Sequence, residues 1–105
     1  MFNRLRALFG TSRPSLSDLL QQGAIVVDVR TPQEYRTGHP KGSRNIPLAS
    51  LSGQLSKLRK KQVPVITCCA SGMRSGKAAK VLQKAGIEAH NGGSWQAVER
   101  ARTSP

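Results

Sequence analysis

The stretch that decides the fold reads VITCCASGMRSGK and spans residues 65–77. Its first residues belong to a strong strand prediction at 63–68, in which Pro64 is tolerated near the start. A continuous β-branched run without polar alternation at 24–29 is typical of a neighbouring strand buried on both faces. Ser and Gly then stand together in a predicted turn at 71–74. The next residues, 75–85, carry an apolar stripe at helical spacing and are followed by a glycine. We therefore predict a buried strand that passes through a tight turn into a helix.

The same succession of strand, turn and helix extends along the chain in both directions. Further extended segments are predicted at 24–29, 45–47 and 87–90, and a turn at 91–93. Further helical segments are predicted at 15–22, from Pro32 to a stop at Gly38, at 53–61, and after a cap at Ser94. This alternation indicates an α/β domain with a mostly parallel sheet.

The length of the chain predicts a single domain, because 105 residues leave no room for two cores. We assign 1–14 to a basic N-terminal segment, 15–100 to the domain and 101–105 to a frayed tail. The first ten residues are expected to form a packed or frayed helix, with a weak membrane-surface anchor as the alternative. No apolar run is long enough to span a membrane, and the N-terminal one is too short for a signal peptide.

The charge balance is strongly basic, with 17 Lys and Arg against five Asp and Glu and a formal net charge of +12. Such a chain attracts anions: nucleic acid, acidic proteins, lipid headgroups or small oxyanions. The basic residues are spread along the chain, with one tight run at 57–61, and no aromatic residue is interleaved with them. We therefore expect a solvated basic surface that binds no specific nucleic acid.

The two cysteines, Cys68 and Cys69, are neighbours in the sequence. Neighbouring cysteines rarely bridge, because the geometry of the bond strains the peptide between them. We therefore expect free thiols in a reducing compartment and, with no signal peptide in view, a cytoplasmic protein.

Cys69 is placed where an α/β fold binds its ligands, at the carboxyl end of a buried strand and before a helix. The start of that helix offers unpaired N–H groups and a partial positive charge. Arg74 and Lys77 add full positive charge. We expect this environment to favour the thiolate and to lower the pKa of the thiol from about 8.5 to about 6–7. The same cradle suits an oxyanion such as thiosulfate, sulfite or phosphate.

The loop CASGMRS at 69–75 resembles the C-x-x-G-x-R-S active-site loop of the rhodanese family of sulfurtransferases. Four further segments resemble family motifs in the same order. They are DVR at 28–30, the set EY at 34–35 with GH at 38–39 and G at 42, NIP at 45–47, and NGGSW at 91–95. The similarity covers residues 15 to 100, and five motifs in order are far more specific than any one of them.

The resemblance implies a three-layer fold, with a small, mostly parallel twisted sheet flanked by helices. It also implies sulfur transfer by double displacement, in which Cys69 takes sulfur from thiosulfate or a persulfide. The resulting persulfide passes the sulfur to cyanide, a thiol or an acceptor protein, without a metal or cofactor. We expect a monomer. The residues expected to bind substrate are Ala70, Ser71, Gly72, Met73, Arg74 and Ser75.

Three residues are expected to support the site rather than to act on substrate. Asp28 and Arg30 are predicted to form hydrogen bonds or an ion pair, and His39 to be buried or to fix a turn. Arg74 has two interpretations, oxyanion binding and attachment to loop carbonyls, and both can hold. Trp95 is expected in the core.

Two alternative functions remain open. Counted from Cys68, the sequence also fits C-x5-R, the spacing of related phosphatases and arsenate reductases, whose loop holds a tetrahedral oxyanion. Gly72 three residues after Cys69 favours the rhodanese register, and Cys68 continues the apolar strand and should face the core. A non-catalytic binding module is the other alternative, disfavoured because inactive family members typically lack the loop cysteine.

Overall fold

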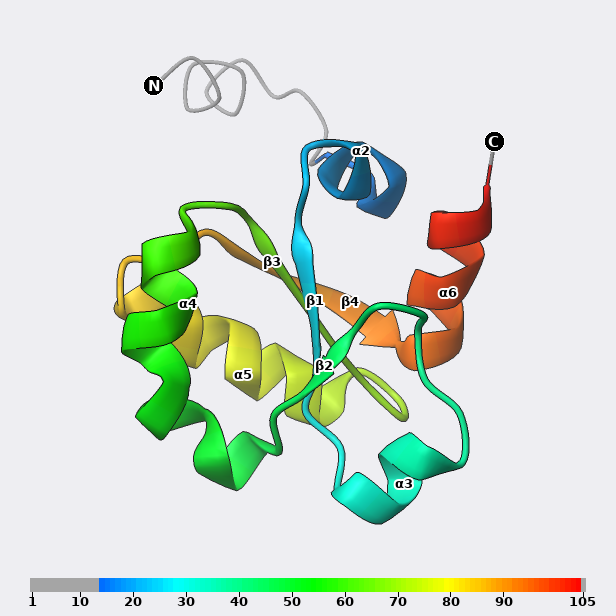
Figure 1. The fold of residues 1–105 in the computed structure, drawn as a ribbon, viewed down its shortest axis with the longest axis horizontal. Coiled ribbons are helices and arrows are strands. Elements are labelled where there is room, and N and C mark those ends of the chain that lie inside the picture. Colours follow the sequence, from blue (N-terminus) through cyan, green and yellow to red (C-terminus); the bar gives the residue numbers. More distant parts are fainter. Residues whose placement is uncertain (1–13, 105) are drawn as a thin grey trace.

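Four parallel strands form one sheet through the centre of the protein (Figure 1). The computed structural model describes residues 14–104. Its strands are β1 (Ile25–Asp28), β2 (Arg44–Asn45), β3 (Val65–Cys69) and β4 (Ala89–Ser94), in the order β2-β1-β3-β4. Each neighbouring pair is parallel, which confirms the predicted α/β class. The basic segment predicted at 1–14 lies, apart from Pro14, outside the described residues.

Helices cover both faces of the sheet and give the three layers that the resemblance implied (Figure 1). They are α2 (Leu16–Gln21), α3 (Pro32–Arg36), the 3-10 helix η1 (Leu48–Gln54), α4 (Leu55–Lys61), α5 (Met73–Lys84) and α6 (Trp95–Thr103). Leu58 of α4 and Leu82 of α5 belong to the core cluster on one face. Leu19 of α2 and Val98 of α6 belong to the cluster on the other. Within residues 14–104, no helix has the length and apolar character needed to cross a membrane.

Strand β3 is buried at all of its positions, which accounts for its lack of charged residues and for the β-branched Val65, Ile66 and Thr67. Successive side chains of a strand point to opposite faces of the sheet. Val65 and Cys69 accordingly lie in the cluster with α4 and α5, whereas Ile66 and Cys68 lie in the cluster with α2 and α6. The sheet therefore separates the two neighbouring thiols.

The turn predicted at 91–93 is wrong, because strand β4 continues through these residues to Ser94. Its register against β3 shifts between Asn91 and Ser94, which marks a β-bulge. Gly93 has a φ of +84°, and a Cβ on Gly92 would lie 2.7 Å from two core side chains. Glycines serve both turns and bulges, so their presence alone did not distinguish the two.

Two helix boundaries also differ from the predictions. Helix α5 begins at Met73, earlier than the predicted start at residue 75, because Gly72 with a φ of +101° acts as its N-cap. Helix α6 continues to Thr103, where the sequence predicts a frayed tail from residue 101. The Glu99 carboxylate accepts hydrogen bonds of 2.8 and 2.7 Å from Arg102, and these extend the ordered helix by a turn.

Candidate active site

The Cys69 sulfur lies at the carboxyl end of β3, where the chain turns into α5. Its Sγ accepts hydrogen bonds from the backbone N–H groups of Gly72 at 3.0 Å and Ser75 at 3.4 Å. The Ser75 Oγ lies 3.3 Å from the same sulfur. Because Cys69 is only 1% exposed, the loop surrounds the sulfur with hydrogen-bond donors and leaves it little contact with solvent.

Two opposing effects set the pKa of Cys69. Burial disfavours the charged thiolate and raises the pKa. Hydrogen bonds from the Ser75 hydroxyl and from the N–H groups of Ser75, Gly72 and Ser71 outweigh burial and lower the pKa to about 7. A substantial fraction of the thiol is therefore ionised near neutral pH, as the sequence led us to expect.

Cys68 has the opposite environment, although it is the next residue along the chain. It is fully buried on the face covered by α2 and α6. Burial, followed by the charge of Asp28, raises the pKa of its thiol far above the usual range. A thiol that stays protonated in the core is a poor nucleophile. The geometry therefore favours the register that counts the loop from Cys69.

Ser75 and Asn91 hold the loop from two different elements, α5 and β4. Ser75 Oγ donates to Asn91 Oδ1 at 2.6 Å, and Asn91 Nδ2 donates to the Gly72 carbonyl at 3.0 Å. A hydroxyl has a single proton, so Ser75 donates either to Asn91 or to the Cys69 sulfur. Turning that proton toward a thiolate adds one donor to the cradle. The role of Asn91 was not predicted from the sequence, because a residue in a turn at 91–93 has no predictable orientation toward the site.

Ser75→Ala is expected to raise the pKa of Cys69 above its value of about 7, because the variant loses the hydroxyl but keeps the backbone N–H. The measurement is the pH dependence of iodoacetamide alkylation, followed by mass at each cysteine. Ser71→Ala is the matched control, since only the backbone N–H of Ser71 contributes to the pKa, and its alkylation midpoint should not move. An unchanged midpoint in Ser75→Ala would mean that the hydroxyl proton remains with Asn91.

Arg74 is held by a carboxylate from α3. Its two terminal nitrogens donate to the two carboxylate oxygens of Glu34 at 2.8 and 2.9 Å. Among the described residues, the side-chain hydrogen bonds of Arg74 go to Glu34 and not to the loop carbonyls that the sequence suggested. The Arg74 guanidinium, assisted by the Thr31 N–H, lowers the pKa of Glu34 to about 2. The pair is therefore fully charged at neutral pH.

Glu34 has a second role that explains its position. It is the third residue of α3, and its Oε1 accepts the Thr31 N–H at 3.1 Å in a capping box. The spacing of Thr31 and Glu34 is a sequence signature for such a cap. Nothing in the sequence indicated the bond to Arg74, which lies 40 positions away. One carboxylate thus connects the start of α3 to the start of α5.

Asp28 and Arg30 form a buried ion pair at the end of β1, with 2.7 Å between Arg30 Nη2 and Asp28 Oδ2. Their side chains are 0% and 4% exposed. Arg30 also donates to the carbonyls of Glu34 at 3.2 Å and Gly38 at 2.6 Å. Its guanidinium lies 5.1 Å from the ring centre of Trp95, which packs against the core. These contacts fix the segment that presents Glu34 to Arg74.

His39 lies just after α3 and contacts that helix. Its Nδ1 is 2.8 Å from the Tyr35 carbonyl oxygen, and its ring stacks on the Tyr35 ring with 3.7 Å between centroids. The residue is exposed, so the expected buried placement is wrong, and its contacts are with Tyr35 of α3.

Apart from Arg74, the loop residues predicted to bind substrate fall into two groups in the structure. Gly72 and Ser75 direct their N–H groups at the sulfur. Ala70, Ser71 and Met73 are exposed, and Met73 retains 76% of its surface. The first group can stabilise negative charge on sulfur, and the second can meet a molecule that approaches from solvent.

Comparison with known proteins agrees with this geometry. The family model described as a rhodanese-like domain matches residues 12–101. YqhL of Bacillus subtilis is 43% identical over 63 residues, which are 60% of this chain and 49% of YqhL. The thiosulfate sulfurtransferase GlpE of Haemophilus influenzae strain PittEE is 34% identical over 71 residues, covering 68% of this chain and 67% of GlpE. The matched region thus spans about half of YqhL and two thirds of GlpE.

Solved structures show the same fold. A rhodanese with anions from Escherichia coli has a TM-score of 0.65 and 29% identity, and the match covers 70% of this chain and 89% of that one. A rhodanese-like domain protein from Staphylococcus aureus has a TM-score of 0.67 and 28% identity, covering 80% and 87%. The chain belongs to the rhodanese-like domain family. Its relatives in that family include a protein named as a thiosulfate sulfurtransferase.

Proposed function

We propose that this chain is a sulfurtransferase in which Cys69 carries sulfane sulfur from thiosulfate or a persulfide donor to a thiol, cyanide or protein acceptor. The observation that carries the proposal is the Cys69 sulfur, which accepts two backbone N–H groups beside the Ser75 hydroxyl and has a pKa of about 7. Such a sulfur is a thiolate nucleophile at neutral pH. The free thiols required for the cycle suit a reducing cytoplasm.

In the first half-reaction the Cys69 thiolate attacks the outer sulfur of thiosulfate. A bond forms between the two sulfurs, the bond from the outer sulfur to the sulfonyl sulfur breaks, and sulfite leaves with the electron pair. In the second half-reaction an acceptor nucleophile attacks the outer sulfur of the persulfide and displaces the Cys69 thiolate. The N–H groups of Gly72 and Ser75 stabilise the thiolate at both ends of the cycle.

The persulfide is the direct test of this proposal. Brief incubation with thiosulfate should add the mass of one sulfur atom to the intact protein, and cyanide should remove it as thiocyanate. A protein that gains no mass from thiosulfate or from glutathione persulfide would refute the proposal. A non-catalytic binding module would give that result, and a phosphatase would instead release phosphate from a model ester.

We propose that Arg74 assists the thiosulfate half-reaction by binding the sulfite group as it departs. Its two hydrogen bonds to Glu34 use one hydrogen on each terminal nitrogen, and the Arg74 side chain remains 37% exposed. Arg74→Ala should lower kcat/KM for thiosulfate by about 10- to 150-fold, since a charge-assisted hydrogen bond contributes about 1.5–3 kcal/mol. Arg74→Lys should recover only part of the loss, because Lys lacks the planar fork.

The matched control for Arg74 is Arg100→Ala, which removes the same charge from an exposed position on α6. Its kcat/KM should stay near the unmodified value. Unchanged kinetics in Arg74→Ala would leave Arg74 only its structural bond to Glu34.

A further inference from the structure

The positive charge of Arg74 is compensated inside the active site. Its two terminal nitrogens donate to both carboxylate oxygens of Glu34, and each of the two side chains is 37% exposed. The hydrogen bonds to Glu34, and then the charges of Glu34 and Cys69, raise the pKa of the Arg74 guanidinium. The guanidinium therefore stands near both the reacting sulfur and a charged carboxylate.

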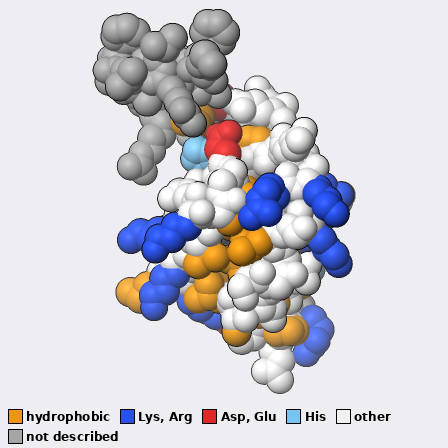
Figure 2. Space-filling model, turned by 90° about the vertical axis from the view of Figure 1, so that its left-hand side faces the viewer, with side chains coloured by type: hydrophobic (Ala, Val, Ile, Leu, Met, Phe, Trp, Pro, Cys, Tyr) orange, Lys and Arg blue, Asp and Glu red, His pale blue; other side chains and the backbone are white. Residues whose placement is uncertain are grey.

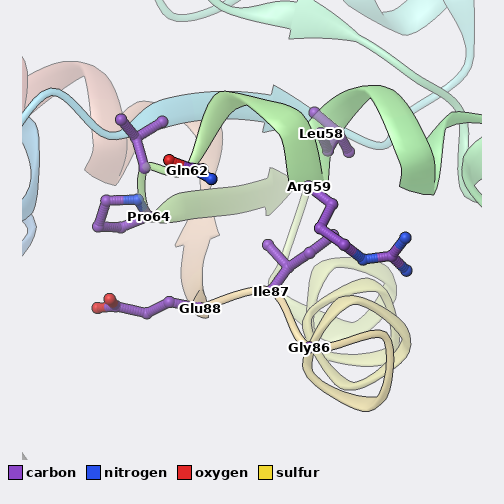
Figure 3. A pocket seen from close by; sticks show the side chains of 8 residues that line it. Leu58, Arg59, Gln62, Pro64, Gly86, Ile87 and Glu88 are labelled. Atoms are coloured by element: carbon purple, nitrogen blue, oxygen red, sulfur yellow. The ribbon is translucent and has the colours of Figure 1, made fainter. Parts of the chain in front are cut away.

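This local compensation differs from the charge of the surface as a whole. Figure 2 shows a face of the protein on which Lys and Arg side chains are widespread and acidic ones are scarce. The hollow drawn in Figure 3 holds Arg59 and Glu88, but it lies beside Pro64, at the amino end of β3 and far from the loop. Lys77 follows Arg74 by one turn of α5 and is exposed, so water and salt screen its charge. A carboxylate beside the reactive loop is thus unusual in a chain with 17 Lys and Arg against five Asp and Glu.

An anion that Arg74 binds is also within range of Glu34. The Nε edge of Arg74 donates to no group within residues 14–104, which leaves the Nε–H and one terminal N–H for such an anion. Anions on two edges of one planar guanidinium lie about 7 Å apart, which is within the Debye length of about 8 Å at physiological salt. The Glu34 carboxylate therefore repels an anion that Arg74 attracts, in proportion to the charge of that anion.

We propose that Glu34 is a specificity-determining residue: its carboxylate weakens selection for thiosulfate, which carries two negative charges, and favours sulfur donors that carry one. Organic thiosulfonates and organic persulfides are donors of this second class. With a thiosulfonate, the Cys69 thiolate attacks the outer sulfur, the bond between the two sulfurs of the donor breaks, and a sulfinate leaves with the electron pair. Repulsion of a competing ligand is a common source of specificity. The donor class rests on the proposed sulfur transfer, whereas the charge effect is measurable without it.

The test compares two reagents that alkylate the same thiolate but differ in charge. Iodoacetate carries one negative charge and iodoacetamide none, so the ratio of their rates at Cys69 does not depend on the pKa of the thiol. Glu34→Gln should raise this ratio about threefold at low salt, because the charge of iodoacetate no longer meets the carboxylate. Gln at this position of a capping box can still accept the Thr31 N–H, so the start of α3 is retained. Arg74→Ala removes the cation, leaves the carboxylate and should lower the ratio.

Two sulfur donors extend the test to the proposed reaction. Thiosulfate and methanethiosulfonate are attacked at an outer sulfur in the same way, but the first carries two charges and the second one. In Glu34→Gln, kcat/KM should rise about tenfold for thiosulfate and about threefold for methanethiosulfonate, because the energy of repulsion is proportional to the charge of the donor. Both gains should shrink at about 1 M salt, where the Debye length falls to about 3 Å.

The matched control is Glu99→Gln. Glu99 accepts two hydrogen bonds from Arg102 on α6, and its side chain is 31% exposed. The variant therefore removes the same charge from a similar ion pair outside the loop. Its alkylation ratio and its donor preference should equal those of the unmodified chain.

Three results would overturn the proposal. A ratio that stays constant or falls in Glu34→Gln would mean that the carboxylate only holds Arg74 in place. An equal rise in Glu99→Gln would mean that net charge alone governs the approach of anions. Equal gains for the two donors would mean that the variant changes the reactivity of the sulfur rather than its selection by charge. A chain that forms no persulfide with any donor would refute the proposed sulfur transfer, and the alkylation ratio would still decide the effect of Glu34.

Discussion

Cys69→Ser is expected to abolish persulfide formation, so that incubation with thiosulfate adds no sulfur to the protein. The loss should be complete, because the thiolate is itself the attacking group and a serine hydroxyl stays protonated at neutral pH. The substituted side chain keeps its size, and Ser can accept the same N–H groups of Gly72 and Ser75. The measurement is intact mass before and after thiosulfate, with thiocyanate release from cyanide as a second readout.

Cys68→Ala is the matched control for this experiment. It removes the other thiol without burying a hydroxyl in the core, where Cys68 is 0% exposed. This variant should still gain one sulfur, although it is expected to be less stable because it leaves a small cavity. The opposite pattern, with sulfur retained in Cys69→Ser and lost in Cys68→Ala, would assign the reaction to the C-x5-R register.

Arg30→Met is expected to lower the free energy of unfolding by about 3–5 kcal/mol, the range seen when one member of a buried ion pair is removed. Asp28 is fully buried and would keep its carboxyl group without its cationic partner. The carbonyls of Glu34 and Gly38 would each lose a donor as well. Urea unfolding, followed by circular dichroism, measures the loss as a lower midpoint at an unchanged slope.

Two further variants test whether the loss comes from the buried pair. Arg102→Met breaks a pair with Glu99 that is exposed on α6, and it should change the midpoint little. Asp28→Asn combined with Arg30→Met removes both charges and should recover part of the stability. If Arg30→Met costs no more than Arg102→Met, the buried pair contributes no more than an exposed one.

The features predicted correctly from the sequence are those encoded by local patterns. The β-branched run of β3 and the apolar stripe of α5 identified the central strand, the helix and the loop between them. The alternation of strands and helices gave the parallel sheet. The motif around Cys69 pointed to a sulfur at the carboxyl end of that strand, where the structure places it.

The features that were missed depend on contacts between distant segments. Glu34 and Arg74 are 40 positions apart, and each reads as an ordinary charged helix residue until α3 and α5 are brought together. Asn91 contacts Ser75 because β4 continues through a bulge, and the sequence did not predict that bulge. Such pairings are determined by the tertiary fold, and a single sequence contains no periodic signal for them.

If Cys69 carries sulfur as proposed, the separation of the two thiols by the sheet bears on how long the protein would keep that sulfur. A persulfide within reach of a second thiol is normally consumed, because that thiol attacks the inner sulfur, forms a disulfide and expels hydrogen sulfide. Cys68 is the nearest thiol along the chain, yet it lies in the core cluster on the other face and its raised pKa keeps it protonated. In the proposed cycle, a persulfide on Cys69 would therefore have no internal route of discharge into Cys68, and its sulfur would leave only to an acceptor from outside.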